Sequence, residues 1–125
     1  MAPGPQLVAF IPSSHLGSSH AFYAGVLGLD RVEATSMANV YDAYGTPLRV
    51  TLVTDHSPSP FTIIGFYVSD VLASMAELRE RGVQFKSYEG YDQDADGVWT
   101  APNGRRVAWF EDPDRNIISL SQPAE

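Results

Sequence analysis

Few residues of this 125-residue chain have a type and spacing suited to chemistry. Cysteine is absent, which excludes disulfides, thiolate metal sites and a cysteine nucleophile. The three histidines (His15, His20 and His56) lack the i, i+4 spacing that brings two metal ligands onto one helix face. No nucleophile elbow, phosphate-binding loop or dinucleotide-binding glycine pattern is present. These patterns therefore identify no catalytic residue and no metal ligand.

One acidic stretch resembles a cation-binding loop. Asp92, Asp94 and Asp96 alternate ahead of Gly97, as the carboxylates of a calcium loop do. A calcium loop is closed by a glutamate at a fixed distance, and this stretch has none. We interpret it as a solvated turn.

The charge and hydropathy of the chain exclude several classes of partner. The net charge is −7, whereas nucleic acids and anionic membranes select basic surfaces. No apolar run approaches the roughly 20 residues that span a bilayer, and residues 1–5 do not begin a signal peptide. We expect a cytoplasmic protein that binds neither nucleic acid nor membrane.

Strand and helix signals alternate in the first half of the chain. An apolar strand ends at Pro12, Ser13 or Ser14 caps the following helix, and Gly28 terminates that helix. The expected elements are a strand at 6–11, a helix at 16–27, strands at 31–35, 39–44 and 48–54, and a turn at 45–47.

The second half repeats this order after a segment rich in proline and serine. Asp70 caps its helix and Gly82 ends it. The expected elements are a strand at 62–68, a helix at 71–81, strands at 83–88, 97–101, 106–110 and 117–121, and a turn at 112–116. Halves of this size are too small to fold alone. We expect one domain (1–125), with module one at about 6–54, a linker at 55–61 and module two at about 62–122.

Two motifs resemble those of one family. Residues 22–29 (Phe-Tyr-Ala-Gly-Val-Leu-Gly-Leu) match its FY-x-x-x-LG-L signature. Residues 112–116 (Asp-Pro-Asp-Arg-Asn) are close to its D-P-D-G-N turn, with Arg115 in place of glycine. With the repeated order of elements, they resemble the vicinal oxygen chelate superfamily of glyoxalase, bleomycin resistance and dioxygenase proteins over nearly the whole chain. We interpret both motifs as determinants of the fold, because Asp112 can bind backbone N–H groups of its own turn.

The resemblance implies an α+β fold of two βαβββ modules, which form a curved mixed sheet, or half-barrel, around a pocket. In many members, His and Glu or Gln side chains from the first and last strands of each module hold a divalent metal, a Lewis acid for two substrate oxygens. Here those positions carry Gln6 or Val8, Thr51, Ile63 and Ser119, with Thr51 taken as the equivalent of Ser119. Because neutral oxygens are weak ligands, we expect no metal and no other cofactor.

Alternation along the strands separates an apolar face from a mixed face. The mixed face carries the candidate ligand-binding residues, which are Arg49, Thr51, Tyr67, Trp99, Trp109 and Ser119. Aromatic rings suit a flat organic ligand, and a guanidinium selects carboxylate, phosphate or enolate groups. Two other interpretations stay open. In one, Arg49 pairs with an acid such as Glu111 or Asp42. In the other, the tryptophans pack in the core and do not stack on a ligand.

Three functions are compatible with these patterns. The first is a metal-free binding module for an aromatic or anionic compound, similar to the bleomycin-resistance branch, which sequesters its ligand. The second is a glyoxalase-like lyase or isomerase, or a dioxygenase-like enzyme, whose metal is held by other residues. The third is a metal-free enzyme that uses Arg49 or a tyrosine. The weak donor set favours the first. Small members of the superfamily usually dimerise, so we expect a homodimer.

Overall fold

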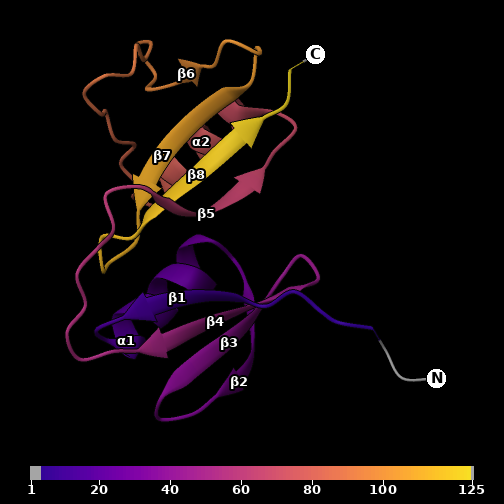
Figure 1. The fold of residues 1–125 in the computed structure, drawn as a ribbon, viewed down its shortest axis with the longest axis vertical. Coiled ribbons are helices and arrows are strands. Elements are labelled where there is room, and N and C mark those ends of the chain that lie inside the picture. The colour runs from indigo at the N-terminus through magenta and orange to yellow at the C-terminus, as the bar shows by residue number, and fades with distance from the viewer. Residues whose placement is uncertain (1–3, 125) are drawn as a thin grey trace. The chain divides into compact units, whose positions relative to one another are not determined.

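A computed structural model describes residues 4–124 and divides into two compact units, Met1–Ser57 and Pro58–Glu125, here called the first and second modules (Figure 1). The first module contains β1 (Ala9–Ser13), α1 (Leu16–His20), η1 (Ala21–Val26), β2 (Asp30–Ala34), β3 (Ala38–Ala43) and β4 (Thr46–Leu52). The second module contains β5 (Thr62–Tyr67), α2 (Val71–Glu80), β6 (Trp99–Thr100), β7 (Arg106–Glu111) and β8 (Ile117–Gln122).

Both modules have the same sheet topology. The strand orders are β1-β4-β3-β2 and β5-β8-β7-β6, and in each sheet the first and last strands of the module pair in parallel while the other pairs are antiparallel. The predicted βαβββ repeat and the two-module fold class are therefore confirmed. Within residues 4–124, no helix is long and apolar enough to cross a membrane.

The helical segment of the first module runs over the predicted residues but changes its winding. The segment α1 continues directly into the π-helix η1, where the Leu27 N–H donates to the Phe22 carbonyl oxygen at 3.0 Å. This wider turn lets two consecutive residues, Phe22 and Tyr23, be buried side by side. Gly28 ends the segment with a φ of 73°, as the sequence predicts.

Two predictions about the start of this segment are wrong. The cap is His15, whose Nδ1 accepts from the Ser18 N–H at 3.1 Å, because the Ser13 hydroxyl is already bonded to Ser19 at 2.6 Å. Pro12 lies inside β1 and does not end the strand. Proline is tolerated there because β1 is the edge strand of its own sheet and needs no donor on its outer side.

The hairpin between β3 and β4 turns one residue earlier than predicted. Tyr44 and Gly45 form the loop, with φ values of 53° and 94°, and Thr46 and Pro47 belong to β4. Both loop residues at positive φ are typical of the two-residue turns that match strand twist. The carboxylate of Asp42 accepts from the Gly45 N–H at 2.8 Å and stabilises this turn.

In the second module, residues 83–88 are not a strand, contrary to the prediction. The side-chain amide of Gln93 takes the place of a neighbouring strand: its Oε1 accepts from the Tyr88 N–H at 2.8 Å, and its Nε2 donates to the Lys86 carbonyl at 2.9 Å. The following strand, β6, has two residues where five were predicted. Helix α2 matches its prediction, with Asp70 as its cap and Gly82 beyond its end at a φ of 91°.

The turn between β7 and β8 is organised by one buried carboxylate. Oδ1 of Asp112 accepts from the Asp114 and Asn116 N–H groups, both at 2.9 Å, and Oδ2 accepts from the Asn116 side-chain amide at 2.9 Å. Arg115, in place of the expected glycine, has a φ of 67°. The motif is therefore a determinant of the fold, as predicted.

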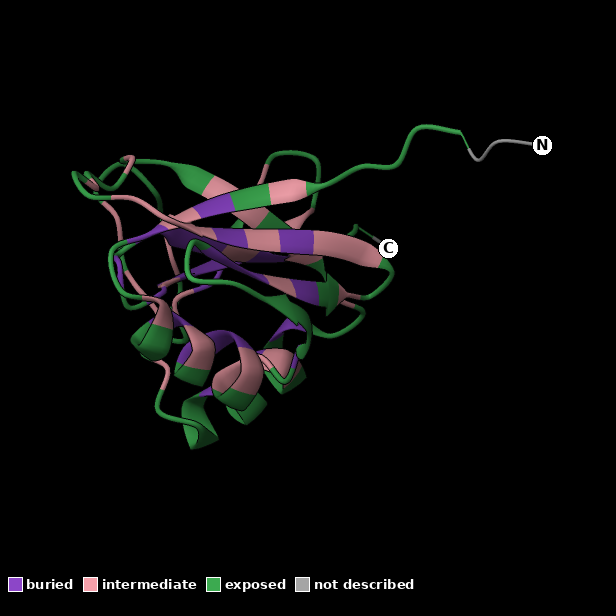
Figure 2. Ribbon diagram, turned by 90° about the horizontal axis from the view of Figure 1, so that it is seen from below, coloured by how far each residue is buried: buried purple, intermediate pink, exposed green. Residues whose placement is uncertain are grey.

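Buried and less buried residues alternate along β4. The helices expose the sides that face away from the sheets (Figure 2). In the second module, α2 lies behind β7 and β8 (Figure 1). Ala108 and Phe110 are fully buried on the helix side, and Phe110 packs on Phe85. The side chains that point away from α2 form what we call the open face of the second module.

Candidate functional site

Two rows of paired residues cross the open face of the second module. One row is Gly65, Ser119 and Trp109, and the other is Tyr67, Ser121, Val107 and Trp99. Residues paired across a sheet point to the same side, so these side chains lie together. The structure thus brings four of the predicted site residues, Tyr67, Trp99, Trp109 and Ser119, onto one surface.

An aromatic cluster covers part of this face. It consists of Tyr88, Tyr91, Trp99 and Trp109. The tryptophan rings stack, with centroids 6.0 Å apart and planes 28° apart, and Tyr91 lies 5.1 Å from each of them. Trp109 is 8% exposed, whereas Tyr91 is 46% exposed. Trp109 therefore belongs to the core, while the outer rings of the cluster offer aromatic surface to solvent.

Beside the aromatic cluster, the sheet surface is formed by the small residues Gly65 and Ser119. A Cβ at Gly65 would collide with the Ser119 hydroxyl, so a larger residue there would require that hydroxyl to turn away. Ser119 pairs with Gly65 on one side and with Trp109 on the other. The open face therefore carries two small residues, Gly65 and Ser119, next to the ring of Trp109.

Tyr88 adds a polar group to the cluster. Its hydroxyl oxygen is buried and has no hydrogen-bond partner among residues 4–124. Burial raises the pKa of the Tyr88 phenol, and the nearby Glu111 carboxylate raises it further. The hydroxyl is therefore neutral at physiological pH and can donate a hydrogen bond. A buried donor without a partner is uncommon, because it costs about 1–3 kcal/mol.

A cation lies at the other side of the same face. The guanidinium carbon of Arg105 is 4.8 Å from the centroid of the Tyr67 ring, and Tyr67 is 78% exposed. Arg105 lies directly before β7, and its contact with the ring of Tyr67 places it on the same face as Val107 and Trp109. The Nη1 atom of Arg105 is buried and has no hydrogen-bond partner in the described part of the chain.

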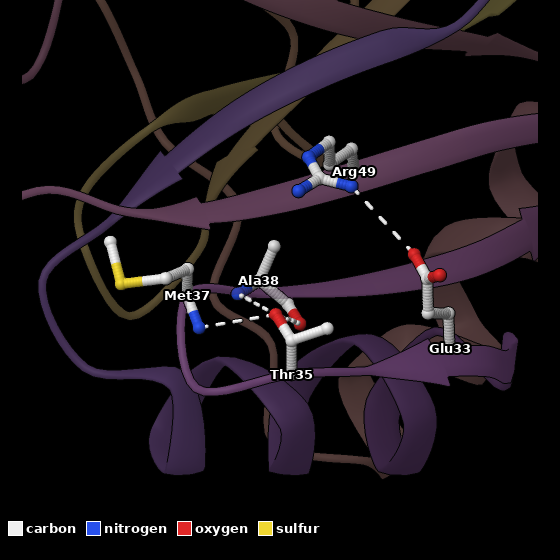
Figure 3. Close-up of polar contacts among 5 residues, drawn as sticks. All are labelled: Glu33, Thr35, Met37, Ala38 and Arg49. Carbon is white, nitrogen blue, oxygen red and sulfur yellow. Dashed lines mark hydrogen bonds and ion pairs between the residues drawn. The ribbon is translucent and has the colours of Figure 1, made fainter.

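The other two predicted site residues, Arg49 and Thr51, lie on β4 of the first module. The Arg49 guanidinium is 3.7 Å from the carboxylate of Glu33, with 36% of its side chain exposed (Figure 3). An acid therefore pairs with Arg49, but it is neither Glu111 nor Asp42. Glu111 lies 4.0 Å from Arg115.

Thr51 lies beside Arg49 on the same side of β4, and its hydroxyl is buried without a partner among residues 4–124. Near it in the sheet, the Thr35 hydroxyl accepts from the Met37 and Ala38 N–H groups and closes the β2–β3 turn (Figure 3). Among the described residues, this part of the first module therefore brings together a paired cation, the turn-forming hydroxyl of Thr35 and the unpartnered hydroxyl of Thr51.

The sequence patterns missed three residues of the open face. Tyr88 is predicted in a strand and Tyr91 falls in no predicted element, although both lie against Trp109. Arg105 was overlooked although the Asn103-Gly104 pair ahead of it is a turn signal, with Gly104 at a φ of 88°. Counting back from Trp109 in steps of two would have placed Arg105 on the same face.

The repeat also corrects the alignment of the two modules. Ser119 pairs with Gly65, five residues before the cap Asp70, and Arg49 pairs with Phe10, five residues before the cap His15. The equivalent of Ser119 is therefore Arg49 and not Thr51. By the same register, the equivalent of Ile63 is Val8 and not Gln6.

The metal-ligand positions implied by the resemblance thus carry Val8, Arg49, Ile63 and Ser119. Two of these side chains have no donor atom, one is a cation and one is a neutral hydroxyl, so this set does not fit a divalent metal. Among residues 4–124, no three His, Asp or Glu side chains gather as metal ligands. His20 is engaged elsewhere, with its Nδ1 2.9 Å from the Tyr41 hydroxyl.

The acidic stretch is organised as a turn. The Asp94 carboxylate accepts from the Asp96 and Val98 N–H groups, both at 2.9 Å. The Oδ1 atom of Asp94 therefore shapes the backbone that leads into Trp99, in agreement with the interpretation as a turn.

Comparison with known proteins agrees with this architecture. Residues 6–120 match the model of the Glyoxalase/Bleomycin resistance protein/Dioxygenase superfamily. No functionally curated protein matches the chain at a significant level. A bleomycin resistance determinant encoded on the transposon Tn5 has a similar structure, with a TM-score of 0.75 and 21% identity over 96% of this chain and 98% of that one.

Two further structures are similar over nearly the whole chain. A glyoxalase/bleomycin resistance protein/dioxygenase from Alicyclobacillus acidocaldarius has a TM-score of 0.72 and 18% identity, with 99% of this chain and 95% of that chain covered. A lactoylglutathione lyase from Agrobacterium tumefaciens has a TM-score of 0.70 and 16% identity, with 97% and 95% covered. At such low identities, the similarity establishes a shared fold only. From the family match over residues 6–120, the chain belongs to the glyoxalase/bleomycin resistance protein/dioxygenase superfamily.

Proposed function

We propose that this protein binds a flat aromatic organic molecule on the open face of its second module, without the help of a divalent metal. The observation that carries this proposal is the aromatic cluster, in which Trp99 and Tyr91 offer ring surface beside the fixed core ring of Trp109. Aromatic groups prefer offset-stacked and edge-to-face contacts at such spacings, and each contact adds about 0.5–1.5 kcal/mol beyond the buried area.

The polar groups around the cluster support the same proposal. A ligand carbonyl or hydroxyl oxygen next to Tyr88 would accept the hydrogen bond that the buried phenol does not make within the described chain. The hydroxyl groups of Ser119 and Ser121 lie on the floor beside the rings. A few polar groups among aromatic walls are typical of sites that orient a small organic ligand.

The residues at the family's metal positions weigh against the metal-dependent alternative. A metal-dependent lyase or dioxygenase needs three or four strong metal ligands. The family's metal positions in this chain supply a single oxygen atom, the hydroxyl of Ser119. Sequestration of a small molecule depends on affinity alone, so it requires none of these metal-coordinating side chains. A homodimer and a cytoplasmic location stay predictions from the sequence.

The proposal is tested with 2-naphthamide, a neutral flat probe, and the two indole N–H signals of the 15N-labelled protein. Trp99 and Trp109 are the only tryptophans, so both signals report on the cluster. We expect both to shift in a saturable way, with a dissociation constant of about 1 mM or tighter. The saturated analogue decalin-2-carboxamide, which cannot stack, serves as the control and should bind more weakly. If neither signal shifts with 2-naphthamide, the proposal is wrong.

A further inference from the structure

Two arginines lie on the mixed faces of this protein, and they differ in how their charge is compensated. Arg49 lies 3.7 Å from the carboxylate of Glu33. Arg105 contacts the ring of Tyr67, but within residues 4–124 no carboxylate pairs with it, and its buried Nη1 has no hydrogen-bond partner. Of these two cations, Arg105 is therefore the one whose charge no carboxylate of the described residues compensates.

A second arginine of the same module shows what is missing at Arg105. Arg79 also lies over a ring, 5.1 Å from the centroid of Phe85, but its Nη2 donates to the Asp96 carbonyl oxygen at 2.7 Å. Arg105 has the corresponding ring contact without an acceptor at Nη1. Because buried charged donors are costly unless they are hydrogen-bonded, an anionic acceptor at this point would be strongly favoured.

The position of Arg105 relates this cation to the aromatic cluster. Strands rise about 3.3 Å per residue, so the Cα of Arg105 lies about 7 Å from that of Val107, which pairs with Trp99. Ser121 pairs with both Val107 and Tyr67 and lies between the rings and the cation on the floor of the face. That spacing matches an aromatic ring system with an acidic group at one end.

We propose that Arg105 is the anion anchor of the open face, so that the ligand is a flat aromatic compound carrying a carboxylate or another planar anionic group. This inference rests on the proposed function and specifies its ligand class. The Tyr67 ring occupies one face of the guanidinium and restricts its orientation. The fork of N–H donors on the guanidinium matches the two oxygens of a carboxylate.

The test compares 2-naphthoate with 2-naphthamide, which have the same rings but differ in charge, again through the two indole signals. The wild-type protein is expected to bind 2-naphthoate about tenfold more tightly, as one charge-assisted contact would give. In Arg105→Met the two probes should bind about equally. Arg79→Met, which removes the matched cation on the helix side, should keep the wild-type preference.

The outcomes separate this inference from the function beneath it. If the wild-type protein binds both probes equally, or if Arg105→Met keeps the preference for 2-naphthoate, the anchor is not Arg105, while binding of 2-naphthamide still supports the proposed function. If neither probe shifts an indole signal, both the inference and the proposed function are overturned. A preference that is lost in Arg49→Met and kept in Arg105→Met would assign the anchor to Arg49.

Discussion

Replacing Asp112 with alanine is expected to lower the free energy of unfolding by about 3–4 kcal/mol. The side chain is 5% exposed and accepts three hydrogen bonds of 2.9 Å within the turn between β7 and β8. Its removal leaves two buried backbone N–H groups and the Asn116 side-chain amide without their acceptor. The loss is measured as the shift of the urea unfolding midpoint at unchanged slope.

Asp92→Ala provides the matched control for this substitution. Asp92 is exposed, and no hydrogen bond of its side chain shapes the acidic turn, so its loss should change the stability by less than about 0.5 kcal/mol. An Asp112→Ala variant within about 1 kcal/mol of the wild type would contradict the role of this carboxylate as the organiser of the turn.

Replacing Trp99 with alanine is expected to weaken the binding of 2-naphthamide at least about tenfold. Trp99 supplies the outer half of the stacked pair, 6.0 Å from Trp109, and Tyr91 packs against it. The variant loses the stacking surface while Trp109 stays in the core. The titration follows the remaining indole signal, and the dispersion of the backbone amide signals in the same spectra reports that the second module is folded.

Two further variants separate stacking from a general loss of apolar surface. Trp99→Leu keeps an apolar side chain without a ring and should bind with intermediate affinity. Phe61→Ala removes another exposed aromatic residue of the second module, outside the aromatic cluster, and should bind as the wild type does. If Trp99→Ala binds 2-naphthamide as tightly as Phe61→Ala does, the ligand does not use the cluster.

Much of the fold was predictable because local signals and the repeat agree. Gly28, Gly82 and the cap Asp70 mark helix ends through their own chemistry, and the structure has each of them as predicted. The failures occurred where a side chain replaces a regular partner. His15 caps α1 because Ser13 is bonded elsewhere, and the amide of Gln93 takes the place of a strand beside residues 83–88. Such contacts depend on tertiary geometry that a pattern does not contain.

The candidate site was predictable only along regular strands. Alternation alone places Tyr67, Trp109 and Ser119 on one side of the sheet. It does not place Tyr88 and Tyr91, which lie in an irregular segment, against the same rings. The sequence also did not predict that Glu33 pairs with Arg49, because a register shift in β2 between Arg31 and Glu33 determines which residue lies beside Arg49.

The most direct test of the central claim is a calorimetric titration of 2-naphthamide into the chelator-treated protein, repeated with one equivalent of zinc, nickel or manganese. The account predicts one site on each chain, with a dissociation constant that metal changes by less than about twofold. This prediction follows from an aromatic cluster that needs no ion and from the residues at the family's metal positions, Val8, Arg49, Ile63 and Ser119, which do not fit a divalent metal. Binding that appears only with metal, at one ion per chain, would contradict it.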